Sequence, residues 1–310
     1  MYSNQLARCC DSVHNEVMKQ IICIGSVLWD VIGRSASHMR QGSDVPGRIT
    51  RVPGGVAFNI AVTLKRFGVD VVLLSSIGRD AEGEALIASC ETLGLKCSHI
   101  YRSDDLPTDR YMGIEGANGL IAAIADSHSL EAAGDKILTP MMHGPLGTAD
   151  APFCGIISLD GNLTHNLMEL ISASPYFAQA DLRVAPASPC KAERLYPFLH
   201  HQRAVFYVNL EEAGFLCKAQ FDATSQAALA LLSKGAKRVL VTNGDKSVCD
   251  ADAKGRLVQR PPIVLATRVT GAGDTFMAAH IAAEMAGASR IDALNIALVS
   301  AARYVSGEAV

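Results

Sequence analysis

Aromatic and charged residues are scarce in this sequence. Phe, Trp and Tyr make up 5% of the 310 residues, and Asp, Glu, Lys and Arg make up 19%, below the usual ~25% for charged residues. The hydrophobic share of 49% excludes intrinsic disorder, which requires low hydrophobicity and high charge. A core of small aliphatic residues, with 26 glycines in the chain, suits an α/β fold whose backbone approaches a ligand closely.

Runs of like charge and long apolar runs are also missing. The 28 basic and 31 acidic residues leave a net charge of −3. No block of five like charges occurs, so the basic stripe that is typical of a nucleic-acid-binding protein is missing. No run of ~18 apolar residues predicts a membrane span, and residues 1–20 lack the apolar core of a signal peptide. We therefore expect no nucleic acid polymer and no membrane as partner, and a cytoplasmic location.

The nine cysteines and nine histidines show no metal-binding spacing. No C-x-x-C pair occurs, and no two histidines stand four residues apart, so structural zinc is excluded. Unpaired thiols of this kind are typical of a reduced, cytosolic protein.

Apolar runs and helical periods alternate along the chain. A buried strand is predicted at Ile21–Val27 and another at Val69–Ser75. A helix is predicted after Gly54–Gly55 and ends at Gly68, and a second covers Ala81–Leu93. Further strands are expected at 155–159, 182–185, 204–208 and 238–242, with helices at 164–172, 189–200, 225–234, 273–285 and 291–301. This order predicts an α/β fold with a mostly parallel sheet.

Two stretches break the alternation. Residues 33–52 are polar without a helical period, and residues 100–125 carry two short β-type runs around a glycine-containing turn. We expect these lid segments to form a small β-sheet, and the whole chain, 1–310, to be a single domain.

The segment Val269–Phe276, VTGAGDTF, contains the candidate catalytic residues. Gly271, Ala272 and Gly273 are small and open a predicted helix, where free N–H groups favour an anion. Asp274 lies in the first turn, where a carboxylate can accept the proton of a hydroxyl that attacks phosphorus. The segment is neither a P-loop nor a G-x-G-x-x-G fingerprint, since Phe276 replaces the third glycine, which disfavours an NAD-dependent dehydrogenase.

Together with Gly54–Gly55, Asn59 four residues later, and Asp30 after the first strand, this segment resembles the ribokinase-like (PfkB) carbohydrate kinases over residues 21–302. The resemblance implies a three-layer α/β sandwich with a mostly parallel central sheet and a small β-sheet lid. It also implies an ATP-dependent kinase that acts on a small molecule, with Mg²⁺ and a monovalent cation such as K⁺ as cofactors, and a homodimer joined through the lid.

The resemblance also assigns roles to individual residues. Asp274 corresponds to the catalytic base, and Gly271, Ala272 and Gly273 to the anion hole. The sugar-binding positions are Asp30, Gly54, Gly55 and Asn59. In the N-x-x-E motif, Asn209 lies near the phosphates and Glu212 helps to hold Mg²⁺. Thr242 and Gly244 match a nucleotide-binding T-x-G-x-x-G motif in which Ser247 replaces the last glycine.

Four stretches, at 46–64, 107–126, 160–163 and 185–191, resemble the pseudouridine kinase subgroup, and they add Asp160 to the substrate-binding residues. Phe58 and Ala185 depart from that subgroup, where Arg and Asp are found. We expect phosphorylation of the 5′-hydroxyl of a ribosyl nucleoside, pseudouridine. The alternatives are a ribokinase, another nucleoside kinase or a fructokinase, and, without catalysis, a nucleoside- or sugar-binding regulator.

Overall fold

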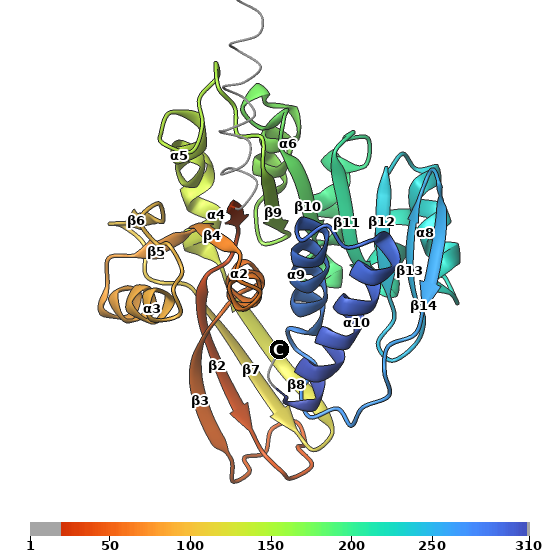
Figure 1. Ribbon diagram of the computed structural model, residues 1–310. Coiled ribbons are helices and arrows are strands. Elements are labelled where there is room, and N and C mark those ends of the chain that lie inside the picture. Colours follow the sequence, from red (N-terminus) through yellow and green to blue (C-terminus); the bar gives the residue numbers. More distant parts are fainter. Residues whose placement is uncertain (1–19, 309–310) are drawn as a thin grey trace, which may run out of the picture.

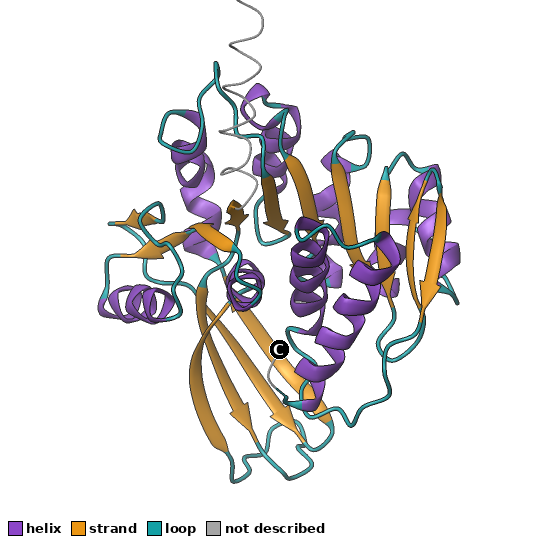
Figure 2. Ribbon diagram, in the orientation of Figure 1, coloured by secondary structure: helices purple, strands orange, loops and turns teal. Residues whose placement is uncertain are grey.

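A computed structural model describes residues 20–308 of the chain, and its centre is an eight-stranded sheet (Figures 1 and 2). In sheet order the strands are β14 (Gly255–Gln259), β13 (Val248–Asp252), β12 (Arg238–Thr242), β11 (Ala204–Asn209), β10 (Asp181–Ala185), β9 (Ile156–Asp160), β1 (Gln20–Ile24) and β4 (Asp70–Leu74). The strands from β12 to β4 are parallel, and β13 and β14 add an antiparallel edge.

Helices cover both faces of this sheet because successive strand residues point to opposite sides. In β1, Ile21 and Cys23 belong to one buried core, and Ile22 and Ile24 belong to the other. The first core includes α2 (Val56–Arg66), α3 (Ala81–Thr92), α9 (Ala272–Met285) and α10 (Arg290–Ser306). The second includes α4 (His128–Ala133), α5 (Thr139–Met142), α6 (His165–Ala173), α7 (Leu210–Cys217) and α8 (Thr224–Ser233). The expected three-layer sandwich is confirmed.

Four strands form a separate sheet, the lid, in the order β3 (Arg48–Gly54), β2 (Leu28–Arg34), β7 (Arg110–Gly116) and β8 (Gly119–Asp126). Figure 1 shows the lid below the helices, away from the central sheet. β8 is an edge strand whose side chains are largely exposed, with Leu120 at 59% and Ile124 at 69%. The expected dimer through the lid stays a prediction.

Several boundaries differ from those expected. The lid begins already at Leu28, and residues 100–109 lie outside it, because β6 (Tyr101–Ser103) pairs with β5 (Ser76–Gly78). The segment Pro189–Phe198 is a 3₁₀ helix with Pro197 inside it, and proline opposes a regular α-helix. The strands β13 and β14 and the short helices α4 and α5 were not predicted, and the expectation about a signal peptide concerns residues outside those described.

No helix between residues 20 and 308 is long and apolar enough to span a membrane.

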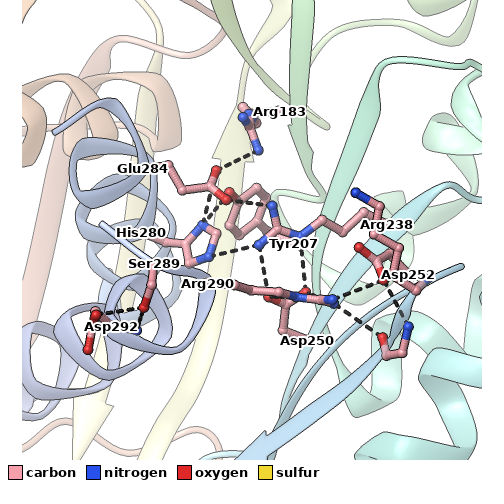
Figure 3. Close-up of polar contacts among 12 residues, drawn as sticks. Arg183, Tyr207, Arg238, Asp250, Asp252, His280, Glu284, Ser289, Arg290 and Asp292 are labelled. Atoms are coloured by element: carbon pink, nitrogen blue, oxygen red, sulfur yellow. Dashed lines mark hydrogen bonds and ion pairs between the residues drawn. The ribbon is translucent and has the colours of Figure 1, made fainter. Parts of the chain in front are cut away.

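Charged side chains form a buried network between the sheet and the helices α9 and α10 (Figure 3). Asp250 of β13 is fully buried and lies between two arginines, with Arg238 at 2.8 Å and Arg290 at 2.8 Å. Arg238 also reaches Glu284 of α9 at 2.5 Å. Burial favours a raised pKa for Asp250, but the hydrogen bonds from Arg290 and Arg238 outweigh it and lower the pKa to about 2. The network therefore ties α9 and α10 to the antiparallel edge of the sheet.

We predict that Asp250→Ala lowers the free energy of unfolding by about 3–5 kcal/mol, because it leaves two arginines partly buried without their partner. Since the pKa of Asp250 lies below its unfolded value, its contribution is complete above pH ~4 and is lost as the pH falls toward 2. Urea unfolding followed by circular dichroism measures the change.

The matched control is Asp104→Ala, which removes the exposed ion pair with Arg79 (2.7 Å). Exposed pairs contribute about 0–1 kcal/mol. Equal losses in the two variants contradict the stabilising role of the buried network.

Candidate active site

A buried carboxylate, that of Asp160, organises the carboxyl edge of the central sheet. Asp160 is the last residue of β9 and is 1% exposed. Its Oδ2 accepts hydrogen bonds from the Ser26 N–H (2.8 Å), the Ser26 hydroxyl (3.0 Å) and the Ala57 N–H (3.0 Å), and its Oδ1 accepts one from the Asn162 N–H (2.7 Å). These contacts with the backbone and with the Ser26 hydroxyl favour a positioning role for Asp160, and its expected contact with substrate stays a prediction.

The two glycines before α2 are required by close packing. A Cβ on Gly54 would overlap the carboxylate of Asp30, and one on Gly55 would overlap the carbonyl of Ser26. Gly55 is also the N-cap of α2 with φ of 99°, a conformation that glycine adopts readily. These glycines place Asp30 beside the start of α2, and burial raises the pKa of Asp30 to about 6.

The N-terminus of α9 places Asp274 against α2. The Asn59 side-chain amide donates a hydrogen bond to Asp274 Oδ2 at 2.8 Å. Burial raises the pKa of Asp274 to about 7, which outweighs the effect of Asn59, and the charges of Asp160 and Asp30 add to the increase. Because its pKa lies near neutrality, Asp274 can take up and release a proton under physiological conditions.

The same helix end presents free backbone donors. Gly271 is its N-cap, with φ of 90°, and no side chain caps the helix. The Ala272 N–H is occupied by the Val269 carbonyl (3.1 Å), which removes Ala272 from the expected anion hole as a direct donor. The N–H groups of Gly273 and Asp274 are left at the helix end, and a Cβ on Gly273 would meet open space. This arrangement suits an anion.

A cavity of about 710 Å³ lies between the lid and the helices. From the lid it is lined by Asp30, Arg34, Thr50 and Glu115, among others, and from the helices by residues that include Asn59 and Gly271. Arg34 and Glu115 pair at 2.6 Å within its wall. The structure thus brings Asp30 and Asp274 to the start of α2, beside Gly54, Gly55 and Asn59, although Asn59 and Asp274 are 215 residues apart in the sequence.

The residues expected to bind the nucleotide lie at the ends of neighbouring strands and do not line this cavity. Asn209 and Thr242 are direct partners at the ends of β11 and β12. Asn209 caps α7 in a capping box with Glu212, whose Oε2 accepts from the Asn209 N–H at 2.8 Å. Burial raises the pKa of Glu212 to about 7, and the nearby charge of Asp274 adds to this.

The turn after β12 forms despite the replaced glycine. Gly244 takes a positive φ of 55°, and Ser247 does not take one. The backbone conformation at Ser247 therefore needs no glycine. Replacing the last glycine of the T-x-G-x-x-G motif by serine does not prevent this turn.

Some residues of the site had little or no signal in the sequence. Ser26 joins Asp160 to Asn162, because its hydroxyl also accepts from the Asn162 amide at 2.8 Å. Tyr304 and Arg268 border the cavity from the end of α10 and the loop before α9. The pair Gly25–Ser26 directly after a strand was the one available hint for Ser26, and no spacing pointed to Tyr304 or Arg268.

We predict that Gly54→Ala raises the KM for the compound bound in this cavity about tenfold, because the added Cβ displaces the Asp30 carboxylate from the cavity. Steady-state kinetics measure the change. Gly33→Ala in β2 is the control, since its Cβ would meet only ordinary contacts at 3.9 Å. An unchanged KM in Gly54→Ala contradicts the placement of Asp30.

Comparison with known proteins assigns the family. The model of the pfkB family carbohydrate kinases matches residues 18–309. YeiI of Escherichia coli, described as an uncharacterized sugar kinase, is 29% identical over 290 residues, which cover 91% of this chain and 76% of that protein. The pseudouridine kinase of E. coli is 26% identical over 263 residues, with coverage of 83% and 81%.

The ribokinase of Thermotoga maritima superposes with a TM-score of 0.75 at 21% identity, and the match covers 93% of this chain and 92% of that structure. Its likeness confirms the ribokinase-like fold. The chain belongs to the pfkB family of carbohydrate kinases, in which the phosphoryl group is transferred from ATP.

Proposed function

We propose that this kinase phosphorylates the 5′-hydroxyl of a ribosyl nucleoside, and that the nucleoside is pseudouridine. The observation that carries the proposal is the placement of Asp274, held by Asn59, beside a cavity lined on one side by the lid. The similarity to the E. coli pseudouridine kinase supports the substrate.

Asp274 acts as the general base. Its carboxylate accepts the proton of the 5′-hydroxyl as that oxygen attacks the γ-phosphorus of ATP, and the bond to the leaving ADP oxygen breaks. Asn59 fixes the carboxylate by donating to one of its oxygens (2.8 Å). Asp30 accepts hydrogen bonds from the ribose hydroxyls and so holds the sugar in line.

The end of α9 holds the transferred group. The N–H groups of Gly273 and Asp274 donate to its oxygens, where charge is concentrated in the transition state. They act without reorganisation, because Gly271 fixes the turn before them. The lid excludes water that would otherwise accept the phosphoryl group.

Glu212 fits the expected magnesium role. The residues from 20 to 308 contain no cluster of three His, Cys, Asp or Glu that could hold a metal by itself. Mg²⁺ in kinases takes one or two carboxylates and completes its shell with phosphates and water, so a single Glu212 at this edge is sufficient. When bound, Mg²⁺ neutralises charge on the ATP phosphates.

The lid favours a substrate larger than a pentose. A cavity of about 710 Å³ is in the range that holds drug-sized ligands. Its lid wall offers a donor, Arg34, and an acceptor, Glu115, paired at 2.6 Å. The uracil ring of pseudouridine exposes both N–H and carbonyl groups. Arg34 can donate a hydrogen bond to a ring carbonyl, and Glu115 can accept one from a ring N–H.

The proposal is tested by measuring ATP-dependent phosphorylation of pseudouridine, uridine, adenosine, ribose and fructose, with the wild type and Asp274→Asn in parallel. We expect the highest kcat/KM for pseudouridine. In Asp274→Asn we expect kcat to fall by about 10²–10⁴, the contribution of a general base, while calorimetry shows pseudouridine still binding.

The outcomes separate the alternatives. A much higher kcat/KM for ribose or fructose overturns the nucleoside assignment and leaves the kinase. Pseudouridine binding without turnover of any compound favours a binding regulator. An unchanged kcat in Asp274→Asn removes Asp274 from the role of base.

A further inference from the structure

The loop before α9 is fastened to the last turn of α10. The Val305 carbonyl accepts hydrogen bonds from the Thr267 N–H (2.9 Å), the Thr267 hydroxyl (3.1 Å) and the Arg268 N–H (3.3 Å). The Tyr304 hydroxyl in turn donates to the Thr270 carbonyl at 2.9 Å. These contacts join the C-terminal end of α10 to the segment that leads into the anion-binding turn.

Tyr304 also sets the position of that turn. A Cβ added to Gly271 would lie 2.5 Å from the Tyr304 hydroxyl, so the ring packs directly against the N-cap of α9. Any shift of Tyr304 moves the N-cap, and with it the N–H groups of Gly273 and Asp274.

Arg268 holds Tyr304 from the other side. Its guanidinium lies 3.8 Å from the centre of the Tyr304 ring, and its Nε donates to the Tyr304 carbonyl at 2.7 Å. Among the described residues, no carboxylate forms an ion pair with Arg268, and the side chain borders the cavity. Its positive charge is therefore available to the site.

The positive charge of Arg268 lies beside the C-terminal end of α10. The C-terminal end of a helix carries a partial negative charge, and the end of α10 lies beside the turn that must take a phosphoryl group. Uncompensated, this charge weakens anion binding. The guanidinium of Arg268 lies at that helix end and offsets it.

We propose that Arg268 is a positioning residue and a built-in cation for phosphoryl transfer: with Tyr304 it fixes the anion-binding turn and neutralises the C-terminal end of α10. The carbonyl of Tyr304 accepts from Arg268, and that of Val305 from Thr267 and Arg268, and the positive guanidinium beside them disfavours a second cation such as K⁺ at this helix end. We accordingly expect no requirement for K⁺ at this helix end. This inference rests on the proposed phosphoryl transfer.

The test is the affinity for the non-hydrolysable analogue AMP-PNP with Mg²⁺, measured by calorimetry, because it needs no sugar. We expect Arg268→Ala to weaken binding about fivefold, the upper end of what one exposed charge at a helix end contributes, and millimolar guanidinium to restore most of it. Arg268→Lys, which keeps the charge, retains more affinity than Arg268→Ala. Wild-type affinity and rate stay the same when KCl is replaced by tetramethylammonium chloride.

Arg303→Ala is the matched control. Arg303 is also a cation in the last turn of α10, but it faces a separate hollow beside Phe67 and does not line the cavity, so we expect its removal to leave AMP-PNP binding unchanged. Wild-type affinity in Arg268→Ala overturns the proposal. A loss that guanidinium does not restore, accompanied by a lower Tm, reduces Arg268 to a structural residue and also overturns it. A wild type that requires K⁺ contradicts the built-in cation.

Binding of AMP-PNP distinguishes this inference from the proposed function. If the wild type binds AMP-PNP but phosphorylates none of the sugars tested, the substrate assignment fails, and the effect of Arg268→Ala on binding still decides the role of Arg268.

Discussion

The hydrogen bonds to the Asp160 carboxylate connect the segments from which the site is built. Through Ser26 they hold the turn between β1 and the lid strand β2, and through the Ala57 N–H they hold the start of α2. Asn59, one turn into α2, then reaches Asp274 at 2.8 Å. The register between the lid, α2 and α9 therefore depends on one buried carboxylate whose oxygens are all used by the protein.

Gathering carboxylates in one region has an electrostatic cost. Asp30, Asp274 and Glu212 all have raised pKa values, mainly because they are buried, and Asp274 is raised further by its acidic neighbours. A carboxyl group whose pKa is raised in the folded state destabilises that state as the pH rises through its pKa. The carboxylates of the site therefore lower the stability of the fold at neutral pH. The same raised pKa makes Asp274 a suitable base. The ion pairs of Asp250, near the opposite end of α9, act in the opposite direction.

Much of this could be predicted from the sequence, for identifiable reasons. Alternating apolar runs predicted the parallel strands, and Gly271–Asp274 with Gly54–Gly55 predicted which chain segments meet at the site. Local patterns could not predict β13 and β14, whose pairing depends on their neighbours in the sheet. Local patterns also could not show whether Asp160 binds substrate or holds neighbouring segments of the chain in place, because the difference lies in which backbone N–H groups face its carboxylate. Tyr304 and Arg268 act through contacts more than 30 residues apart in the chain, which no motif records.

If Asp274 is the base and burial holds its pKa near neutrality, the ionisation of this one carboxyl group controls the rate. The pH dependence of kcat/KM reports the ionisation of groups in the free enzyme and tests this most directly. Since only the deprotonated carboxylate accepts the proton, we predict a plateau at alkaline pH and a decline on the acid side with an apparent pKa of about 7. A profile that stays flat down to pH 5 contradicts the account.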